Sequence, residues 1–144
     1  MNTQPIMQGD EMHNLLPQRP PIVMVDKFYG VDDNISCTGL SVKETNIFCG
    51  NGYLHESGIV EHIAQSAAAR VGFIFTQKNE PVPLGFIGSV DKLTINFLPK
   101  VGSELYTTIT VMQEVMDITL VAAKVETEGQ VVAECKMKIF LKRD

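Results

Sequence analysis

The chain has few of the residues that build disulfide frameworks or metal sites. Its three cysteines are odd in number, widely spaced, and free of any C-x-x-C or histidine-rich pattern: Cys37, Cys49 and Cys135. This spacing argues against a disulfide framework and a zinc site, and it favours free, buried thiols. No segment indicates a metal ion or an organic cofactor, and we expect neither.

Long apolar runs and basic clusters are also absent. No apolar run approaches the roughly 18 residues of a membrane span, and Met1 to Gln8 has neither the basic region nor the apolar core of a signal peptide. We therefore expect a cytoplasmic protein without a membrane span. The formal net charge of −5 and the lack of a Lys/Arg cluster argue against nucleic acid as a partner, because its binding needs a concentrated basic surface.

The length of 144 residues is that of about one domain. Such a chain buries roughly two-thirds of its unfolded surface and needs no disulfide or metal ion to stabilise its core. The sequence contains no repeat, linker or low-complexity segment. We therefore expect one domain over residues 1–144.

One long helix is predicted from Gly58 to Lys78. Ser57 stands at the position of an N-cap, and the segment from Asn79 to Pro83 ends the helix. At about 100° per residue the apolar and polar side chains separate into two arcs. The apolar arc holds Val60, Ile63, Ala64, Ala67, Ala68, Val71, Ile74 and Phe75. The opposite arc holds Glu61, His62, Gln65, Ser66, Arg70 and Gln77. Small residues such as Gly72 would let another backbone approach closely, so a sheet could pack tightly against this helix.

The rest of the chain is rich in strand signals. A short helix is predicted over Gly9 to Leu15, and a hairpin follows around the turn at Asp32-Asp33-Asn34. Alternating apolar residues and turn signals predict these strands: Ile22 to Val31, Ile35 to Val42 with an extension over Lys43 to Phe48, Leu84 to Phe97, Glu104 to Val115, Ile118 to Thr127 and Gln130 to Leu141. The order of hairpin, helix and meander predicts an α+β fold in which one antiparallel sheet wraps around one long helix.

Three segments carry a resemblance to a known family. Leu15 to Asp26 (LLPQRPPIVMVD) is similar to the motif L-L-P-H-R-x-P-x-L-L-V-D, with Gln18 in place of the usual histidine. Ile59 to Ala67 (IVEHIAQSA) is similar to I-I-E-A-L-A-Q-A-A, and Gly85 to Leu105 is similar to the segment that ends in P-x-x-G-D-x-L. In this order the three segments resemble the hot-dog β-hydroxyacyl-acyl-carrier-protein dehydratases of the FabA/FabZ type.

The loop before the helix departs from that family. Active members usually carry G-H-F-P-x-x-P-x-M-P-G there, with a catalytic histidine, whereas this chain has Gly50 to Gly58 (GNGYLHESG). The shorter loop resembles that of the variant dehydratase-like proteins of aryl-polyene and flexirubin pigment clusters, D-G-x-L-P. In this match His55 stands where the variant has proline.

The resemblance implies loss of water from a 3-hydroxyacyl thioester in fatty-acid or aryl-polyene-type synthesis. Glu61 matches the family's catalytic carboxylate, and His55 is the histidine of the loop that could replace the usual base. Gly58, at the start of the helix, would leave its N–H groups open to the thioester carbonyl. Gln65, one turn after Glu61, would orient Glu61 or a water molecule. The alternative for each of these residues is that it is an ordinary surface or loop residue without a role in catalysis.

Two glycines of the predicted strand after the helix are further candidates for substrate binding. Gly85 and Gly88 would let the strand backbone approach the acyl chain or its pantetheine arm. The alternative is a strand bulge. His62 adjoins Glu61 but points about 100° away around the helix, so we do not expect it to act on the same atom.

Three functions stay open at this point. The first is an enzyme, a hydro-lyase that acts on an acyl thioester linked to acyl carrier protein. The second is a thioesterase, because the same fold hosts enzymes that use a helix carboxylate to activate water. The third is a catalytically degenerate subunit that binds acyl chains or supports an active dehydratase. In the family the site spans two chains, so a homodimer or a heterodimer with another hot-dog protein, or a higher oligomer, is expected; edge-to-edge pairing would also remove exposed strand edges.

Overall fold

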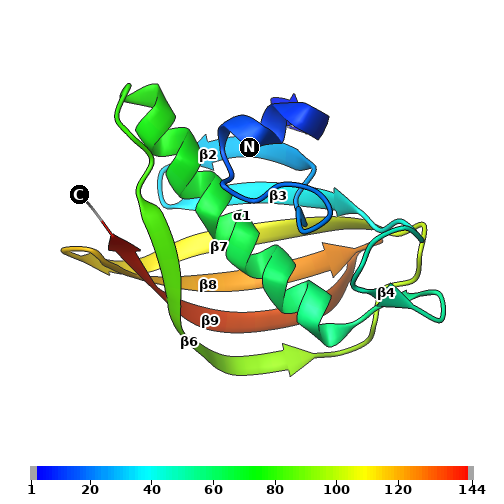
Figure 1. The fold of residues 1–144 in the computed structure, drawn as a ribbon. Coiled ribbons are helices and arrows are strands. Elements are labelled where there is room, and N and C mark those ends of the chain that lie inside the picture. Colours follow the sequence, from blue (N-terminus) through cyan, green and yellow to red (C-terminus); the bar gives the residue numbers. More distant parts are fainter. Residues whose placement is uncertain (1–2, 143–144) are drawn as a thin grey trace.

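The computed structural model describes residues 3–142. A seven-stranded antiparallel sheet in the order β1-β2-β3-β7-β8-β9-β6 curves around one helix, α1 (Figure 1). This is the predicted α+β arrangement. The elements are β1 (Met7–Gln8), the 3-10 helix η1 (Gly9–Asn14), β2 (Lys27–Asp32), β3 (Ile35–Ser41), β4 (Cys49–Gly50), β5 (Tyr53–Leu54), α1 (Glu56–Gln77), β6 (Leu84–Ile95), β7 (Glu104–Val115), β8 (Ile118–Thr127) and β9 (Gln130–Lys142).

The meander of the second half agrees with the sequence prediction. β7 and β8 have the predicted bounds, and β6 and β9 differ by two residues or fewer at their ends. Alternation of buried and exposed positions along β7 to β9 places one face against α1, as the period of two requires. The core between that face and the helix includes Ile59, Ile63, Ile109, Val125 and Met137, which are fully buried.

Two predicted strand segments of the first half are wrong. Residues 22–26 are not in a strand, because β2 begins only at Lys27. Two backbone groups of this segment bond to a helix side chain instead: Gln65 bonds the Met24 N–H at 2.6 Å and the Ile22 carbonyl at 2.9 Å. Residues 43–48 form turns, in which Asn46 accepts from the Phe48 N–H at 2.8 Å through its side chain.

The helix begins two residues earlier than predicted. It runs over Glu56–Gln77, and its N-cap is His55, with no side-chain capping bond. Ser57, the predicted N-cap, is an exposed residue of the first turn. At the other end, the Lys78 N–H reaches the Ile74 and Phe75 carbonyls at 3.3 and 3.1 Å, which closes the last turn.

The buried surface of α1 includes part of the polar arc as well as the apolar arc. His62, Gln65 and Ser66 are fully buried, whereas several apolar residues on the other side are only half-buried. The N-terminal segment covers the polar side of α1 and packs the second cluster, Met12, Leu15, Leu16, Val25, Phe28 and Ala69, against it. Gly72 allows this packing, because a Cβ there would overlap the Leu15 carbonyl. Small residues thus admit another backbone as predicted, but that backbone belongs to the N-terminal segment.

Among residues 3–142, no helix is long and apolar enough to cross a membrane.

Candidate active site

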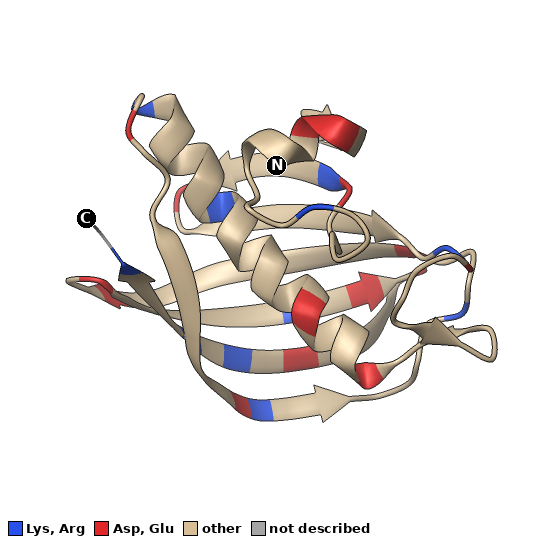
Figure 2. Ribbon diagram, in the orientation of Figure 1, with Lys and Arg blue, Asp and Glu red and all other residues tan. Residues whose placement is uncertain are grey.

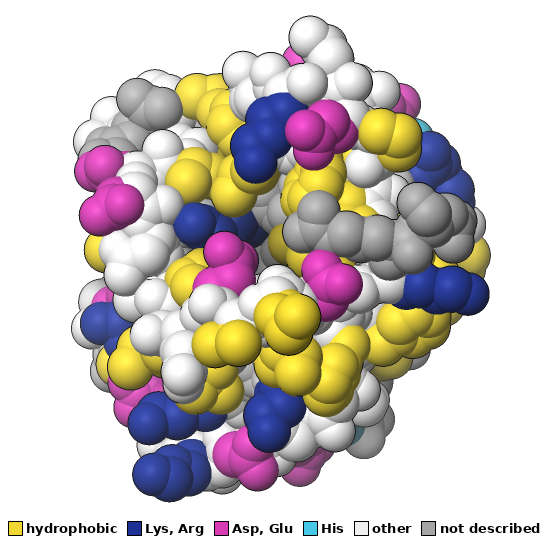
Figure 3. Space-filling model, turned by 90° about the vertical axis from the view of Figure 1, so that its left-hand side faces the viewer, with side chains coloured by type: hydrophobic (Ala, Val, Ile, Leu, Met, Phe, Trp, Pro, Cys, Tyr) yellow, Lys and Arg dark blue, Asp and Glu magenta, His cyan; other side chains and the backbone are white. Residues whose placement is uncertain are grey.

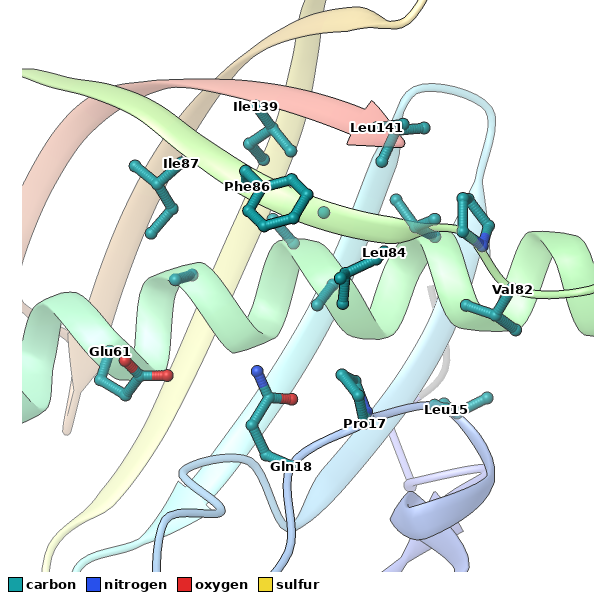
Figure 4. Close-up of a pocket in the computed structure, with 16 residues that line it drawn as sticks. Leu15, Pro17, Gln18, Glu61, Val82, Leu84, Phe86, Ile87, Ile139 and Leu141 are labelled. Carbon is teal, nitrogen blue, oxygen red and sulfur yellow. The ribbon is translucent and has the colours of Figure 1, made fainter. Parts of the chain in front are cut away.

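An apolar cavity of about 290 Å³ lies along the outer side of α1, between β6 and the N-terminal segment (Figure 4). Ala64, Ala67, Ala68 and Val71 of α1 form its floor, and apolar residues of β6 and β9 form one wall. Leu15, Pro17 and Gln18 form the opposite wall. Glu61 is the charged residue of the lining. The cavity therefore suits an aliphatic chain with a reactive group beside one carboxylate.

Glu61 lies in the second turn of α1, and its neighbour one turn on fixes its position. The Gln65 amide donates to Glu61 Oε2 at 2.8 Å. Glu56 lies in the first turn of α1, where a carboxylate complements the helix dipole, and Figure 2 shows both acidic residues of the helix in its N-terminal half. The predicted pairing of Glu61 with Gln65 is thus present in the structure.

Gln65 is also a structural residue, fully buried and bonded on three sides. Its amide donates to the Ile22 carbonyl as well as to Glu61, and its Oε1 accepts from the Met24 N–H. All of its hydrogen-bonding groups are therefore used by the protein itself. The prediction that Gln65 orients Glu61 fits this geometry, while direct contact with a substrate stays a prediction.

His62 belongs to the scaffold and points away from the cavity. Its Nδ1 lies 2.6 Å from the Met24 carbonyl and its Nε2 lies 2.7 Å from Thr107 Oγ1. A neutral ring satisfies both contacts, with Nδ1–H donating to the carbonyl and Nε2 accepting from the hydroxyl. Burial lowers the pKa of His62 below its ordinary value, which keeps the ring in this neutral form.

His55 and Gly58 lie away from this cavity. His55 bonds the Gly50 carbonyl through Nε2 at 2.9 Å and does not line the cavity around Glu61. The Gly58 N–H is donated to the His55 carbonyl at 3.0 Å. A Cβ at Gly58 would overlap Phe48 and Leu54, so close packing accounts for the glycine. The catalytic role of His55 and the carbonyl-binding role of Gly58 stay predictions.

The two glycines of β6 differ in their surroundings. Gly85 lines the cavity, and a Cβ there would make ordinary contacts of 3.7 Å with Ile139 and Leu141. Gly88 lies at a register shift between β6 and β9, and a Cβ there would overlap the Phe140 ring. The bulge considered as an alternative is therefore present at Gly88. A role for either glycine in substrate binding stays a prediction.

Sequence reasoning did not assign Gln18 to the site. The structure brings it into the lining opposite α1, where it and Glu61 are the polar side chains of the cavity (Figure 4). The signal was present in the sequence, because Gln18 replaces a histidine in the L-L-P-H-R motif. What the sequence could not show is that this segment lies against the helix that carries Glu61.

A second cavity of about 210 Å³ adjoins the first and shares Ala67, Val71, Ile139 and Leu141 with it. It lies between the C-terminal half of α1 and the β7–β8 hairpin. Figure 3 views that end of the molecule and shows a hollow bordered by apolar and charged side chains. Arg70 lines this cavity and donates to the Asp33 carbonyl at 3.0 Å. No group of three or more His, Cys, Asp or Glu side chains within residues 3–142 could hold a metal ion.

With the fold and the position of Glu61 established, comparison with known proteins identifies the family. A family model for ApeP-like proteins, described as ApeP dehydratase, matches residues 10–144. The chain belongs to the ApeP-like dehydratase family. This confirms the predicted relationship to hot-dog dehydratases and to the dehydratase-like proteins of aryl-polyene clusters. The function is accordingly dehydratase-like.

Individual proteins agree with membership of the ApeP-like family. The chain is 27% identical over 139 residues to a 3-hydroxyacyl-[acyl-carrier-protein] dehydratase FabZ of Rickettsia bellii, covering 92% of this chain and 94% of the relative. It is 26% identical to the FabZ of Desulfotalea psychrophila, covering 86% of each. In fold it is similar to a chain of the dehydratase heterocomplex ApeI:P from Xenorhabdus doucetiae, with a TM-score of 0.85, 16% identity, and coverage of 92% and 91% of the two chains.

Proposed function

We propose that this chain takes part in the elimination of water from a 3-hydroxyacyl thioester to give a trans-2-enoyl thioester. The observation that carries the proposal is one carboxylate, Glu61, at an apolar cavity long enough for an acyl chain to lie along the helix. The activity for which the FabZ relatives are named supports acyl carrier protein as the carrier of this thioester. Fatty-acid or aryl-polyene-type synthesis is the proposed setting.

The reaction needs a base and an acid. The base removes a proton from C2, the electrons of that C–H bond form the C2=C3 double bond, and the C3–O bond breaks as the acid protonates the departing hydroxyl to water. Glu61 supplies one of these groups. Gln65, bonded to Glu61 Oε2, holds the carboxyl group in place, and the apolar walls keep bulk water away from the reacting carbons.

The other group is proposed to come from a second hot-dog chain. β6 is one of the two edge strands of the seven-stranded sheet and carries four half-exposed apolar side chains, Leu84, Phe86, Ile87 and Leu93. A long apolar edge strand of this kind is suited to pairing with another strand. A partner paired with β6 would also cover the outer side of the cavity. The ApeI:P neighbour, which comes from a heterocomplex, supports a second chain, either a copy of this one or a different dehydratase.

In such a pair His55 would act on the partner's cavity. The His55 side chain is 43% exposed at the N-cap of α1, and its Nδ1 lies 4.0 Å from Glu56 Oε1, so another chain could reach this side of the ring. A homodimer would then combine Glu61 of one copy with His55 of the other. In a heterodimer, the partner would supply its own histidine next to Glu61.

The test uses purified protein with 3-hydroxyoctanoyl carrier protein, alone and mixed with a hot-dog dehydratase from the same organism. Loss of water is followed by mass spectrometry, and release of free carrier thiol is measured alongside to detect a thioesterase. The Glu61→Gln variant should abolish the turnover to which this chain contributes. The control is Glu44→Gln, at an exposed position of the turns that precede α1, which should retain it.

Each outcome separates the candidate functions. Turnover alone that survives Glu61→Gln would show that the proposed site is wrong. Turnover that requires the partner and survives Glu61→Gln would make this chain a supporting subunit. Release of thiol without loss of water would favour a thioesterase.

A further inference from the structure

Gln18 carries a buried hydrogen-bond acceptor with no partner. Its Oε1 is inaccessible to solvent and makes no hydrogen bond with any residue that the structure describes. A buried acceptor left unpaired costs about 1–3 kcal/mol, and such atoms are uncommon enough in folded proteins to need a reason. Because Gln18 lines the cavity beside Glu61, a bound molecule is the natural partner for this amide.

The backbone around Gln18 is fixed in place by its neighbours. The Arg19 guanidinium donates to three carbonyls, those of Leu16 at 2.7 Å, Gln18 at 2.9 Å and His13 at 3.2 Å. The Leu15 carbonyl packs against Gly72 of α1. The backbone that carries Gln18 is therefore held against α1, so little of it needs to be ordered when a ligand binds.

Figure 4 shows how the two polar side chains face one another. The Glu61 carboxylate is directed along the helix toward Gln18, and the Gln18 side chain rises from the N-terminal segment toward α1. Apolar side chains of the cavity lie beyond them. A group between Glu61 and Gln18 would meet a carboxyl on one side and an amide on the other, with its hydrocarbon part in the apolar space.

We propose that Gln18 is a positioning residue that hydrogen-bonds the 3-hydroxyl group of the acyl substrate. A hydroxyl both donates and accepts hydrogen bonds, so it can donate to the Gln18 carbonyl oxygen while its own oxygen faces Glu61. Gln18 moves no proton in this scheme and serves to select and orient the hydroxyl. The inference rests on the proposed function.

The test measures ligand binding to a variant that is expected not to catalyse the elimination of water. The full-length Glu61→Gln protein is titrated with 3-hydroxyoctanoyl-pantetheine and with octanoyl-pantetheine, which lacks the hydroxyl. One hydrogen bond to a buried amide predicts about tenfold tighter binding of the hydroxylated compound. Adding Gln18→Met should abolish this preference while leaving octanoyl-pantetheine binding within about twofold. Adding Gln18→His should retain part of it, because an imidazole nitrogen can accept the same bond.

A merely structural role of Gln18 predicts different results. Gln18→Met would then lower the melting temperature and weaken both compounds equally. On our inference the melting temperature of Gln18→Met stays the same or rises, because an unpaired acceptor has been removed. A preference that persists in Gln18→Met overturns the inference and leaves the proposed function intact. Failure of both compounds to bind overturns the proposed function, and this inference with it.

Discussion

Replacement of Gln65 by methionine tests the central hydrogen-bond cluster of the fold. Gln65 is fully buried, and the substitution keeps its length and removes its three hydrogen bonds. The Met24 N–H is then left without a partner at a fully buried residue, at a cost of about 1–3 kcal/mol. Ile22 is 41% exposed and Glu61 is half-buried, so water can replace part of those two bonds. We expect the free energy of unfolding to fall by about 3 kcal/mol.

The measurement is urea unfolding at one fixed protein concentration, because association with a second chain would raise the apparent stability. The control is Gln77→Met, the same substitution at an exposed position of the same helix. Glutamine and methionine have similar helix propensities, so this control should stay within about 0.5 kcal/mol of the unchanged protein. If Gln65→Met unfolds at the same urea concentration as Gln77→Met, the three bonds do not hold the N-terminal segment as we argue.

Three further predictions follow from single sites. Burial lowers the pKa of His62 below 6.5, so the unfolded state binds more protons below that pH. The free energy of unfolding should therefore decline as the pH falls from about 6.5, by up to about 1.4 kcal/mol per pH unit; an equal decline in His62→Gln would contradict this. Gly88→Ala should destabilise the protein by about 1–3 kcal/mol through its clash with Phe140, and a double-mutant cycle with Phe140→Ala should show non-additive effects; additive effects would exclude the clash. Burial raises the pKa of Cys135 to about 11, so at about pH 8 only about one thiol in a thousand is ionised; mass spectrometry should show its slow labelling in the native protein and rapid labelling in urea.

The sheet could be predicted well because its signals are local. β7 and β8 alternate apolar and polar residues and are separated by clear turn signals, and their predicted bounds agree with the structure. Residues 22–26 have equally good strand residues, yet they form no strand. The backbone groups of Met24 bond to the side chains of Gln65 and His62, about 40 residues away in sequence. A local sequence pattern does not show that a distant side chain will bond the backbone groups that a strand would otherwise pair.

The buried and exposed faces of α1 also depend on partners that a local sequence pattern does not reveal. Periodicity places Gln65, His62 and Ser66 on a polar arc, for which solvent is the ordinary environment. Each is buried because a specific acceptor or donor lies opposite it: Met24, Thr107 and Thr38. Glu61 could be singled out through the family motif. Its cavity could not, because the opposite walls come from β6 and from the segment around Gln18.

Gln65 serves both the fold and the site, because it contacts the N-terminal segment and Glu61 at once. Gln65 bonds the Ile22 carbonyl with the same amide group that bonds Glu61. The position of the carboxylate is therefore coupled to the segment that runs from Leu15 to Met24, and this segment also presents Gln18 to the cavity. A change that shifts the N-terminal segment relative to the helix would move Glu61 and Gln18 together. We therefore expect substitutions at Gly72, where the Leu15 carbonyl meets the helix, to impair substrate binding although Gly72 does not line the cavity.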